Sequence, residues 1–294
     1  MIKANSTPLI LNGRTVRDEV LKNIKSEINQ IKLENKRLPG LAVVLVGEAP
    51  ASYTYVKNKE KKCTELGIYS EVHRLPGNTS ENELTQLIKS LNKKKNIDGI
   101  LLQLPLPAHI KSEKVIEVID PKKDIDGLHP HNLGKLLSGQ WCLKPCTPQG
   151  IIEILKHYSI NISGASTVVL GRSILVGKPL SLLLLRENAT VTIAHSKTKN
   201  IEEVTSSADI LICAVGKPRL VKKSWVKPGA TVIDVGISKI NTNENTEITG
   251  DVDFEEVKSV CGAITPVPGG VGPVTIAMLI KNTMEAYKEN REKI

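Results

Sequence analysis

The sequence predicts an α/β fold of two lobes, an N-terminal α/β catalytic lobe and a Rossmann-like parallel-sheet lobe, with a cleft between them. Apolar strand-like runs alternate with amphipathic helical segments along the whole chain, which is typical of parallel sheets covered by helices. A length of 294 residues suits two domains, and 40% apolar residues can fill two cores.

The first lobe is expected to comprise residues 1–146. Its pattern predicts helices over 14–36, 51–66, 80–94 and 112–119, and strands over 41–46, 70–75 and 99–104. A loop is expected over 120–145. The second lobe is expected over residues 147–275, with a helix over 147–158 and strands over 167–170, 190–194, 209–214, 231–235 and 263–265. The polar run 238–247 is expected to be a surface loop, and a helix follows over 276–287.

The composition excludes several classes of protein. The net charge is +9, but only 3% of residues are aromatic, and no basic stretch is interleaved with stacking residues as single-strand nucleic-acid binding requires. The N-terminus is polar and no apolar stretch reaches the length of a membrane span, so a cytoplasmic protein without membrane contact is expected. Five cysteines without CxxC spacing or a histidine cluster are interpreted as reduced thiols, with no metal site.

A strand, a glycine turn and a helix start follow one another at Thr167–Gly177. Gly171 suits the tight turn, and Gly177 suits a close approach at a helix N-terminus that can receive a pyrophosphate. The spacing departs from the usual G-x-G-x-x-G, and a plain strand–helix turn is the alternative. The next strand ends in His195-Ser-Lys-Thr without the carboxylate of an NAD site. We therefore expect NADP, with Arg172 and Ser196 at its 2′-phosphate.

Polar side chains mark the first lobe as well. Ser52, Tyr55 and Lys59 share one face of the helix after the first strand, although most lysines in such a cluster are solvated charges. Gln103 lies in an otherwise apolar strand and needs a partner, either another polar side chain or the main chain alone. Asp126 lies in a turn-prone segment, where it either caps a turn or holds adjacent N–H donors of a heterocycle.

The stretch Thr265–Thr275 alternates proline and glycine. Three prolines fix φ, and Gly269, Gly270 and Gly272 can adopt positive φ, which makes a stiff, bare main-chain surface. An ordinary surface loop is the alternative. Its position between a strand and a helix favours the rim of a ligand cleft.

These residues together resemble the bifunctional methylenetetrahydrofolate dehydrogenase/cyclohydrolase family. The matching motifs appear in the family's order and cover nearly the whole chain: Ala51-Ser-Tyr-Thr-Tyr-Val-Lys-Asn-Lys59, Asp98-Gly-Ile-Leu-Leu-Gln-Leu-Pro-Leu106, Lys123-Asp-Ile-Asp-Gly-Leu128, Pro145-Cys-Thr-Pro-Gln-Gly150, Gly171-Arg-Ser173, His195-Ser-Lys-Thr198 and Thr265-Pro-Val-Pro-Gly-Gly-Val-Gly-Pro273.

The resemblance implies a homodimer of purine and one-carbon metabolism that acts on tetrahydrofolate derivatives, with or without a polyglutamate tail. It assigns Lys59 and Gln103 to cyclohydrolase chemistry, and it places Ser52, Tyr55 and Asp126 on the folate. It also implies that Pro268, Gly269 and Gly270 flank the folate, and that the final helix, residues 276–294, packs on the first lobe. NADP would contact Gly171, Arg172, Ser173, Gly177, Ser196 and the main chain of Ile237.

Two rival functions follow from parts of the sequence. A two-lobe NADP dehydrogenase of the shikimate type explains the second lobe but gives Tyr55, Gln103 and the Pro/Gly stretch no role. A basic nucleic-acid-binding module explains the charge alone.

Overall fold

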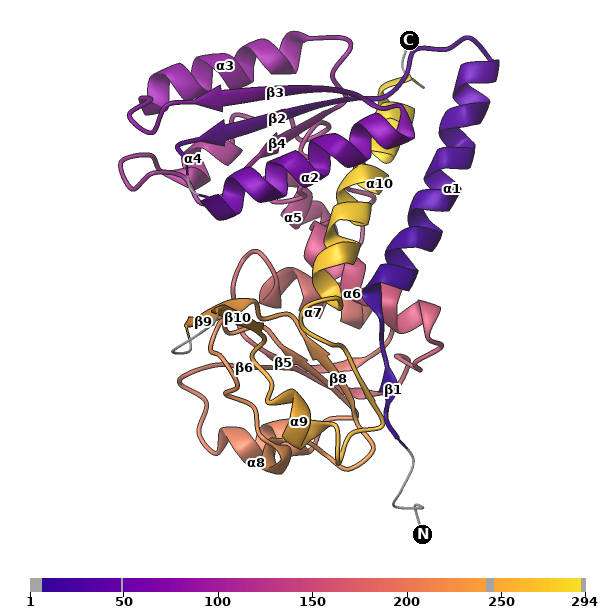
Figure 1. The fold of residues 1–294 in the computed structure, drawn as a ribbon, viewed down its shortest axis with the longest axis vertical. Coiled ribbons are helices and arrows are strands. Elements are labelled where there is room, and N and C mark those ends of the chain that lie inside the picture. Colours follow the sequence, from indigo (N-terminus) through magenta and orange to yellow (C-terminus); the bar gives the residue numbers. More distant parts are fainter. Residues whose placement is uncertain (1–6, 49, 242–245, 292–294) are drawn as a thin grey trace. The chain divides into compact units, whose positions relative to one another are not determined.

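The computed structural model describes residues 7–48, 50–241 and 246–291, without the side chains of residues 50–55, 57, 58, 241, 246 and 291. The chain forms two compact α/β units (Figure 1). One comprises the residues up to Asp18 together with Thr147–Thr275, and we call it the six-stranded unit after its sheet. The other comprises Glu19–Cys146 and Ile276–Ile294, and we call it the three-stranded unit. The predicted two-domain α/β class is confirmed.

The three-stranded unit is a parallel sheet of order β3-β2-β4 between helices. Figure 1 shows α2 and α3 on opposite faces of this sheet. Every residue of the central strand is buried, as a parallel strand covered on both faces requires. Its elements are α1 (Gly13–Leu33, which begins in the other unit), β2 (Gly40–Val46), α2 (Pro50–Leu66), β3 (Tyr69–Leu75), α3 (Glu81–Lys93), β4 (Gly99–Leu102), α4 (Ser112–Ile116) and α5 (Pro130–Leu137).

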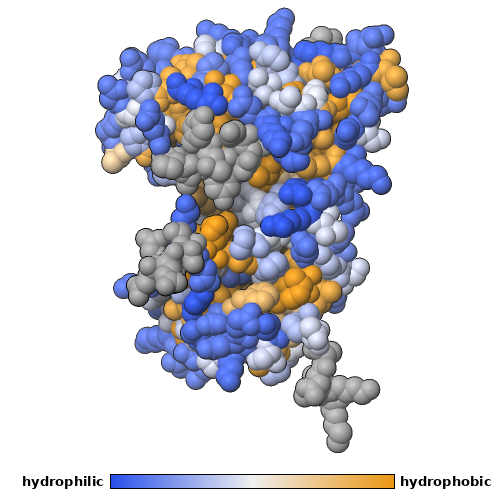
Figure 2. Space-filling view, viewed as in Figure 1, coloured by the Kyte–Doolittle hydropathy of each residue, from blue (hydrophilic) through white to orange (hydrophobic). Residues whose placement is uncertain are grey.

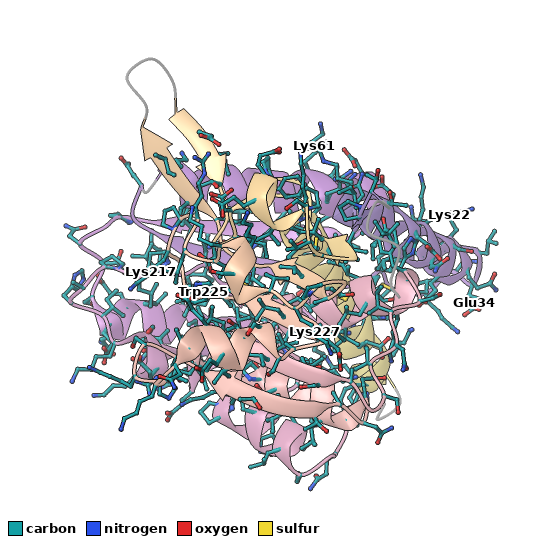
Figure 3. The ribbon with its side chains drawn as sticks, turned by 90° about the horizontal axis from the view of Figure 1, so that it is seen from below. Lys22, Glu34, Lys61, Lys217, Trp225 and Lys227 are labelled. Carbon is teal, nitrogen blue, oxygen red and sulfur yellow. The ribbon has the colours of Figure 1, made fainter. Side chains whose placement is uncertain are left out.

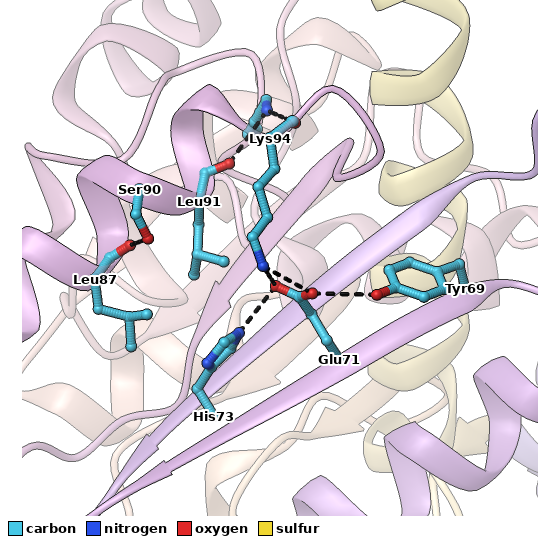
Figure 4. Close-up of polar contacts among 8 residues, drawn as sticks. Tyr69, Glu71, His73, Leu87, Ser90, Leu91 and Lys94 are labelled. Carbon is cyan, nitrogen blue, oxygen red and sulfur yellow. Dashed lines mark hydrogen bonds and ion pairs between the residues drawn. The ribbon is translucent and has the colours of Figure 1, made fainter.

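Side-chain hydrogen bonds cap the start of α3 and connect the residue after its end to strand β3. At its start, Ser80 and Glu83 form a reciprocal capping box, which satisfies amides that the first turn leaves unpaired. Beyond its end, Lys94 donates to Glu71 on the edge strand β3, and Glu71 also contacts Tyr69 and His73 (Figure 4). Burial raises the pKa of Glu71, but the hydrogen bonds from Lys94 and His73 outweigh that effect and lower it.

The six-stranded unit is a parallel sheet of order β1-β11-β8-β7-β5-β6. Successive strands lie on either side of β5, so the strand order reverses between β5 and β7. Its elements are β1 (Leu9–Ile10), α6 (Cys146–His157), β5 (Ser166–Leu170), α7 (Gly177–Arg186), β6 (Thr190–Ala194), α8 (Ile201–Ser206), β7 (Ile210–Cys213), a 3₁₀ turn (Lys223–Trp225), β8 (Thr231–Asp234), β9 (Ser238–Asn241), β10 (Thr246–Thr249), α9 (Phe254–Val257), β11 (Ala263–Ile264) and α10 (Val271–Arg291, which ends in the other unit).

The structure corrects three predicted segments and adds a helix that was not predicted. The loop expected over 120–145 contains α5, which His129 caps and Pro130 starts. The run expected to be a surface loop over 238–247 is the antiparallel pair β9–β10, whose main-chain ladder stabilises strands that lack an apolar pattern. Strand β4 ends at Leu102 rather than at residue 104. Helix α8 had not been predicted.

The first residues of the chain also lie elsewhere than expected. Strand β1 pairs in parallel with β11, so it extends the sheet of the six-stranded unit, whereas the sequence assigned residues 1–146 to one lobe. Two residues show no periodicity, and only the pairing partner reveals the strand.

The last helix packs within the three-stranded unit from Ile276 onward. Asn282 donates through Nδ2 to the carbonyls of Ile125 (2.8 Å) and Lys144 (2.8 Å). The buried Tyr287 donates to the carbonyl of Arg37 at 2.5 Å. The helix begins at Val271, five residues earlier than predicted, so Gly272 and Pro273 belong to its first turn rather than to a loop.

Polar residues cover much of the surface. Hydrophilic side chains dominate the face in Figure 2, with apolar patches between them. Lys22, Lys61, Lys217 and Lys227 are exposed (Figure 3). Among the described residues no helix is both long and apolar enough to cross a membrane.

Candidate active site

The three-stranded unit brings Lys59 and Gln103 together. Lys59 lies on α2 and Gln103 directly follows β4; the amine Nζ donates to the amide Oε1 at 3.1 Å. The amide Nε2 of Gln103 donates to the carbonyl of Leu104 at 2.7 Å, which turns Oε1 toward the lysine. Gln103 therefore has the polar side-chain partner that was one of the two expectations, and the alternative of main-chain bonding alone is wrong.

Electrostatics distinguish Lys59 from the solvated lysines of the same helix. Burial lowers its pKa, because the charged ammonium loses hydration, and the negative charge of Asp126 opposes that effect. Burial raises the pKa of Asp126, and the charge of Lys59 opposes that. An amine with a lowered pKa can accept and return a proton near neutral pH.

The two aspartates of the segment Lys123–Leu128 have different roles. Asp124 is buried and accepts hydrogen bonds from the amide of His129 (2.8 Å) and from Nδ2 of Asn132 (2.9 Å), so it fixes the start of α5. Asp126 is only half-buried and interacts electrostatically with Lys59. The capping role thus belongs to Asp124, which leaves Asp126 as the candidate ligand residue.

Ser52 and Tyr55 lie on α2, seven and four residues before Lys59, so the three positions share one helix face. Their side chains lie outside the described residues.

In the six-stranded unit, the candidate residues follow the carboxyl ends of neighbouring strands. Gly171 follows β5 and Ser196 lies just beyond β6, and β5 is also next to the point where the strand order reverses. Open α/β sheets bind nucleotides at such a point. Gly171 has φ +130°, and a side chain there would collide with the carbonyl oxygen of Ala214.

The structure explains the need for glycine at position 177 differently from the sequence, which predicted a close approach of a bound pyrophosphate. A Cβ at this position would collide with the carbonyl of Gly171 and lie 2.9 Å from Cα of Arg172, so the glycine allows the loop to close on itself. Ser173 stabilises the turn before α7, because its hydroxyl accepts a hydrogen bond from the amide of Val176 at 3.1 Å.

These residues fit an anionic dinucleotide. The N-cap of α7, Val176, makes no side-chain cap hydrogen bond, so the positive end of a ten-residue helix is left for an anion. Arg172 and Ser196 are exposed beside it on adjacent strand ends. Ile237, three residues after the carboxyl end of β8, is 53% exposed, so its main chain and side chain are accessible to a ligand.

The Pro/Gly stretch belongs to the six-stranded unit up to Thr275. Gly269 is the glycine with positive φ (+112°), and its carbonyl accepts the amide of Gly13 at 2.9 Å. A Cβ at Gly270 would lie 2.6 Å from the carbonyl oxygen of Pro266. The segment Pro268–Gly270 is thus tightly folded main chain, as its composition predicted.

Sequence reasoning missed two buried carboxylates of the six-stranded unit, Asp234 and Asp251. Both are at most 4% exposed, and both accept several main-chain amides. Each aspartate has a glycine close to it in the sequence, Gly236 after Asp234 and Gly250 before Asp251. A Cβ on Gly236 would collide with the carboxyl group of Asp251, and a Cβ on Gly250 would collide with that of Asp234.

Within the described part of the chain, no group of three or more His, Cys, Asp or Glu side chains is arranged to hold a metal ion. All five cysteines are buried.

Comparison with known proteins identifies the same two regions. Residues 11–126 match the profile "Tetrahydrofolate dehydrogenase/cyclohydrolase, catalytic domain", and residues 145–291 match "Tetrahydrofolate dehydrogenase/cyclohydrolase, NAD(P)-binding domain". The chain is 52% identical over 279 residues to "Bifunctional protein FolD" of Acetivibrio thermocellus, covering 95% of this chain and 96% of that protein.

Solved structures agree. The bifunctional FolD methylenetetrahydrofolate dehydrogenase/cyclohydrolase of Campylobacter jejuni superposes with a TM-score of 0.92 at 44% identity, covering 95% of this chain and 98% of that one. The Trypanosoma brucei methylenetetrahydrofolate dehydrogenase-cyclohydrolase, solved with NADP cofactor and an inhibitor, gives 0.92 at 35% identity, covering 97% and 99%.

Proposed function

Because the chain belongs to the tetrahydrofolate dehydrogenase/cyclohydrolase family, we propose that it catalyses two consecutive reactions on a one-carbon folate. The first is the NADP-dependent oxidation of 5,10-methylenetetrahydrofolate to 5,10-methenyltetrahydrofolate. The second is hydrolysis of that product to 10-formyltetrahydrofolate.

The hydrogen bond between the half-buried Lys59 amine, whose pKa burial lowers, and Oε1 of Gln103 carries this proposal. Hydrolysis of the methenyl cation needs a group that moves protons at neutral pH, and a desolvated lysine meets that need. A nucleic-acid-binding protein has no use for an amine held in this way, and a shikimate-type dehydrogenase gives its partner Gln103 no role.

In the oxidation, NADP accepts a hydride from the methylene carbon and leaves the folate as the methenyl cation. The protein's own contribution is position. We assign Gly171, Arg172, Ser173, Gly177, Ser196 and the main chain of Ile237 to the dinucleotide. We assign Ser52, Tyr55, Asp126 and the segment Pro268–Gly270 to the folate, with Asp126 accepting hydrogen bonds from pterin N–H donors.

In the hydrolysis, water adds to the cationic carbon. Neutral Lys59 takes one proton from that water through Nζ, and Gln103 keeps Nζ in place. When the bond between this carbon and N5 breaks, N5 gains a proton and the carbon becomes the formyl group on N10. Because water delivers two protons and N5 keeps one, the other is released to solvent.

The choice of NADP over NAD rests on Arg172 and Ser196. A guanidinium and a hydroxyl at adjacent strand ends suit a 2′-phosphate, and the carboxylate that binds a ribose 2′-hydroxyl is missing from the end of β6. The Trypanosoma brucei relative was solved with NADP.

We further propose that the protein is a cytoplasmic homodimer that supplies one-carbon units for purine synthesis and accepts folates with or without a polyglutamate tail. The edge strand β6 and the neighbouring helix α7 expose Ile193 (40%) and Leu185 (61%), an apolar pair that a second copy would cover. Light scattering coupled to size exclusion would give twice the monomer mass.

One assay tests the proposal. Purified protein is mixed with 5,10-methylenetetrahydrofolate and either NADP or NAD, while absorbance follows the methenyl product and the reduced dinucleotide. We expect reduced NADP, a transient methenyl signal and 10-formyltetrahydrofolate at the end, with a slower rate for NAD.

Arg172→Ala should raise the KM for NADP and leave the KM for NAD unchanged, and Arg186→Ala, at an exposed arginine, serves as the control. No oxidation with either dinucleotide would reject the dehydrogenase.

A further inference from the structure

Asp251 gathers three consecutive main-chain amides. It lies two residues after β10, with none of its surface exposed. Its Oδ2 accepts the amides of Val215 (2.6 Å) and Gly216 (3.1 Å), and its Oδ1 accepts the amide of Lys217 (2.7 Å). Hydrogen bonds to a buried carboxylate are among the stronger ones in proteins, so this side chain fixes the segment 214–217.

That segment borders the point where the strand order of the sheet reverses. It directly follows β7, and Ala214 donates to the carbonyl of Leu170 at the end of β5. In a trans peptide the N–H of one residue and the C=O of the residue before it point in opposite directions. The amide of Val215 points at Asp251, and accordingly the carbonyl of Ala214 packs on Gly171 in the phosphate loop.

The same geometry applies to the next two peptides. Because the amides of Gly216 and Lys217 also point at Asp251, the carbonyls of Val215 and Gly216 point away from it. One carboxylate therefore turns three successive carbonyls, those of Ala214, Val215 and Gly216, away from itself, and the first of them lies against Gly171. Main-chain carbonyls in such a row can accept hydrogen bonds from ribose hydroxyls or from a carboxamide.

Asp251 is itself held by a second buried carboxylate. Asp234, the last residue of β8, accepts the amides of Asp251 (2.9 Å) and Val252 (3.0 Å). Gly236 and Gly250 leave room for the two carboxyl groups, since a Cβ on either glycine would collide with one of them. The arrangement is built into the sheet and does not depend on a flexible side chain.

We propose that Asp251 is a positioning residue for the dinucleotide: it holds the segment 214–217 so that its carbonyls face the bound cofactor. The inference rests on the proposed function only in taking that cofactor to be NADP. Asp251 acts through the main chain and does not touch the ligand.

The test measures NADPH binding directly, by fluorescence titration of the full-length protein without folate. Asp251→Asn replaces a carboxylate oxygen by an amide that repels the loop's N–H groups. We expect the dissociation constant for NADPH to rise about tenfold or more. Asp253→Asn, which alters a carboxylate two residues away that pairs with Lys222, should change the constant by less than about twofold.

A second pair of variants covers the case in which Asp251→Asn fails to fold. Gly216 (φ +67°) and Gly229 (φ +83°) both have open space where a Cβ would lie, so alanine strains each backbone to the same degree without a collision. Only Gly216 belongs to the segment that Asp251 holds. Gly216→Ala should weaken NADPH binding several-fold, and Gly229→Ala should not.

Hydrolysis of preformed methenyltetrahydrofolate, which consumes no dinucleotide, should stay within about twofold of the wild-type rate in all four variants. The inference is overturned if Gly216→Ala binds NADPH as tightly as Gly229→Ala, or if folded Asp251→Asn binds it as the wild type does. Wild-type protein that binds NADPH but oxidises no folate would reject the proposed function and leave this comparison intact.

Discussion

Gln103 contacts Lys59 through a neutral oxygen. An amide oxygen at 3.1 Å holds the amine without adding a charge, so burial remains the main influence and lowers the pKa of Lys59. A carboxylate at the same place would favour the ammonium form instead.

We therefore predict that Gln103→Glu raises the pKa of Lys59. Because the neutral amine is the proposed base, the cyclohydrolase rate should reach half its maximum at a higher pH in the variant, and should fall at pH 7. The pH profile of methenyltetrahydrofolate hydrolysis checks this. Gln140→Glu, at an exposed glutamine of the same unit, should keep the wild-type profile. An unshifted profile in Gln103→Glu would show that Gln103 does not influence the protonation of Lys59.

The sequence showed both residues, but for different reasons. A polar amide in an apolar run is anomalous, so Gln103 stood out in the sequence, although it lies just beyond β4 and is half-buried. Lys59 was one lysine among several on α2, and only its desolvation in the folded structure separates it from them. The buried pair Asp234 and Asp251 was missed because its partners are main-chain amides, which no side-chain pattern reveals.

Among the helices and strands, α3 has its C-terminal end capped by a side chain from another segment of the chain. The buried amine of Lys123 donates to the carbonyls of Asn92 (2.8 Å) and Lys94 (2.8 Å), which the helix leaves unpaired at its C-terminus. Positive charge at this end is also favourable for the helix dipole.

Lys123→Met should remove the donor of the Asn92 carbonyl and leave that of Lys94 only its long bond from the amide of Ile97, and so lower the free energy of unfolding by about 1–3 kcal/mol. Urea denaturation followed by circular dichroism measures the change. The neighbouring Lys122 is exposed, so Lys122→Met should change the stability by less than about 0.5 kcal/mol. Equal effects for the two variants would mean that Lys123 does not act as this cap.

Strong periodicity made most elements predictable, and its lack explains the failures. Helix α3 and strand β2 have clear apolar patterns and were found to within one residue. The strand pair β9–β10 is mostly polar, and α5 is short and starts inside a run rich in loop-forming residues. These elements depend on main-chain pairing and on Asp124, which a local pattern does not encode.

For the whole molecule, the buried Asp234 links stability to pH. Burial raises its pKa from 3.8 to about 7, against the opposing hydrogen bonds from the amides of Val252 and Asp251. The folded state therefore holds a proton that the unfolded chain releases between about pH 4 and pH 7. Its contribution to stability is complete below the unfolded pKa and is lost as the pH rises toward 7.

We predict that the stability of the wild type relative to Asp234→Asn decreases as the pH rises from about 4 to about 7. Thermal unfolding of both proteins at several pH values tests this. The lowered pKa of Asp253, which its hydrogen bond with Lys222 causes, gives a control: above pH 4 the difference between wild type and Asp253→Asn should stay flat. A flat difference for Asp234→Asn as well would show that this carboxyl does not take up a proton on folding.

Domain class and family were predictable because their signals are repeated along the whole chain, in alternating elements and ordered motifs. The assignment of β1 was not, since a strand of two residues acquires its identity from β11, more than 250 residues away. Long-range pairing of this kind is the part of the fold that local sequence patterns leave open.

The central claim is that one amine performs the hydrolysis while oxidation depends on other residues. Lys59→Met tests it in a single cuvette containing 5,10-methylenetetrahydrofolate and NADP, with the exposed Lys61→Met as control. We predict that the Lys59 variant still reduces NADP in part, that methenyltetrahydrofolate accumulates, and that its hydrolysis falls to the uncatalysed rate. Hydrolysis at the wild-type rate in Lys59→Met would contradict the account.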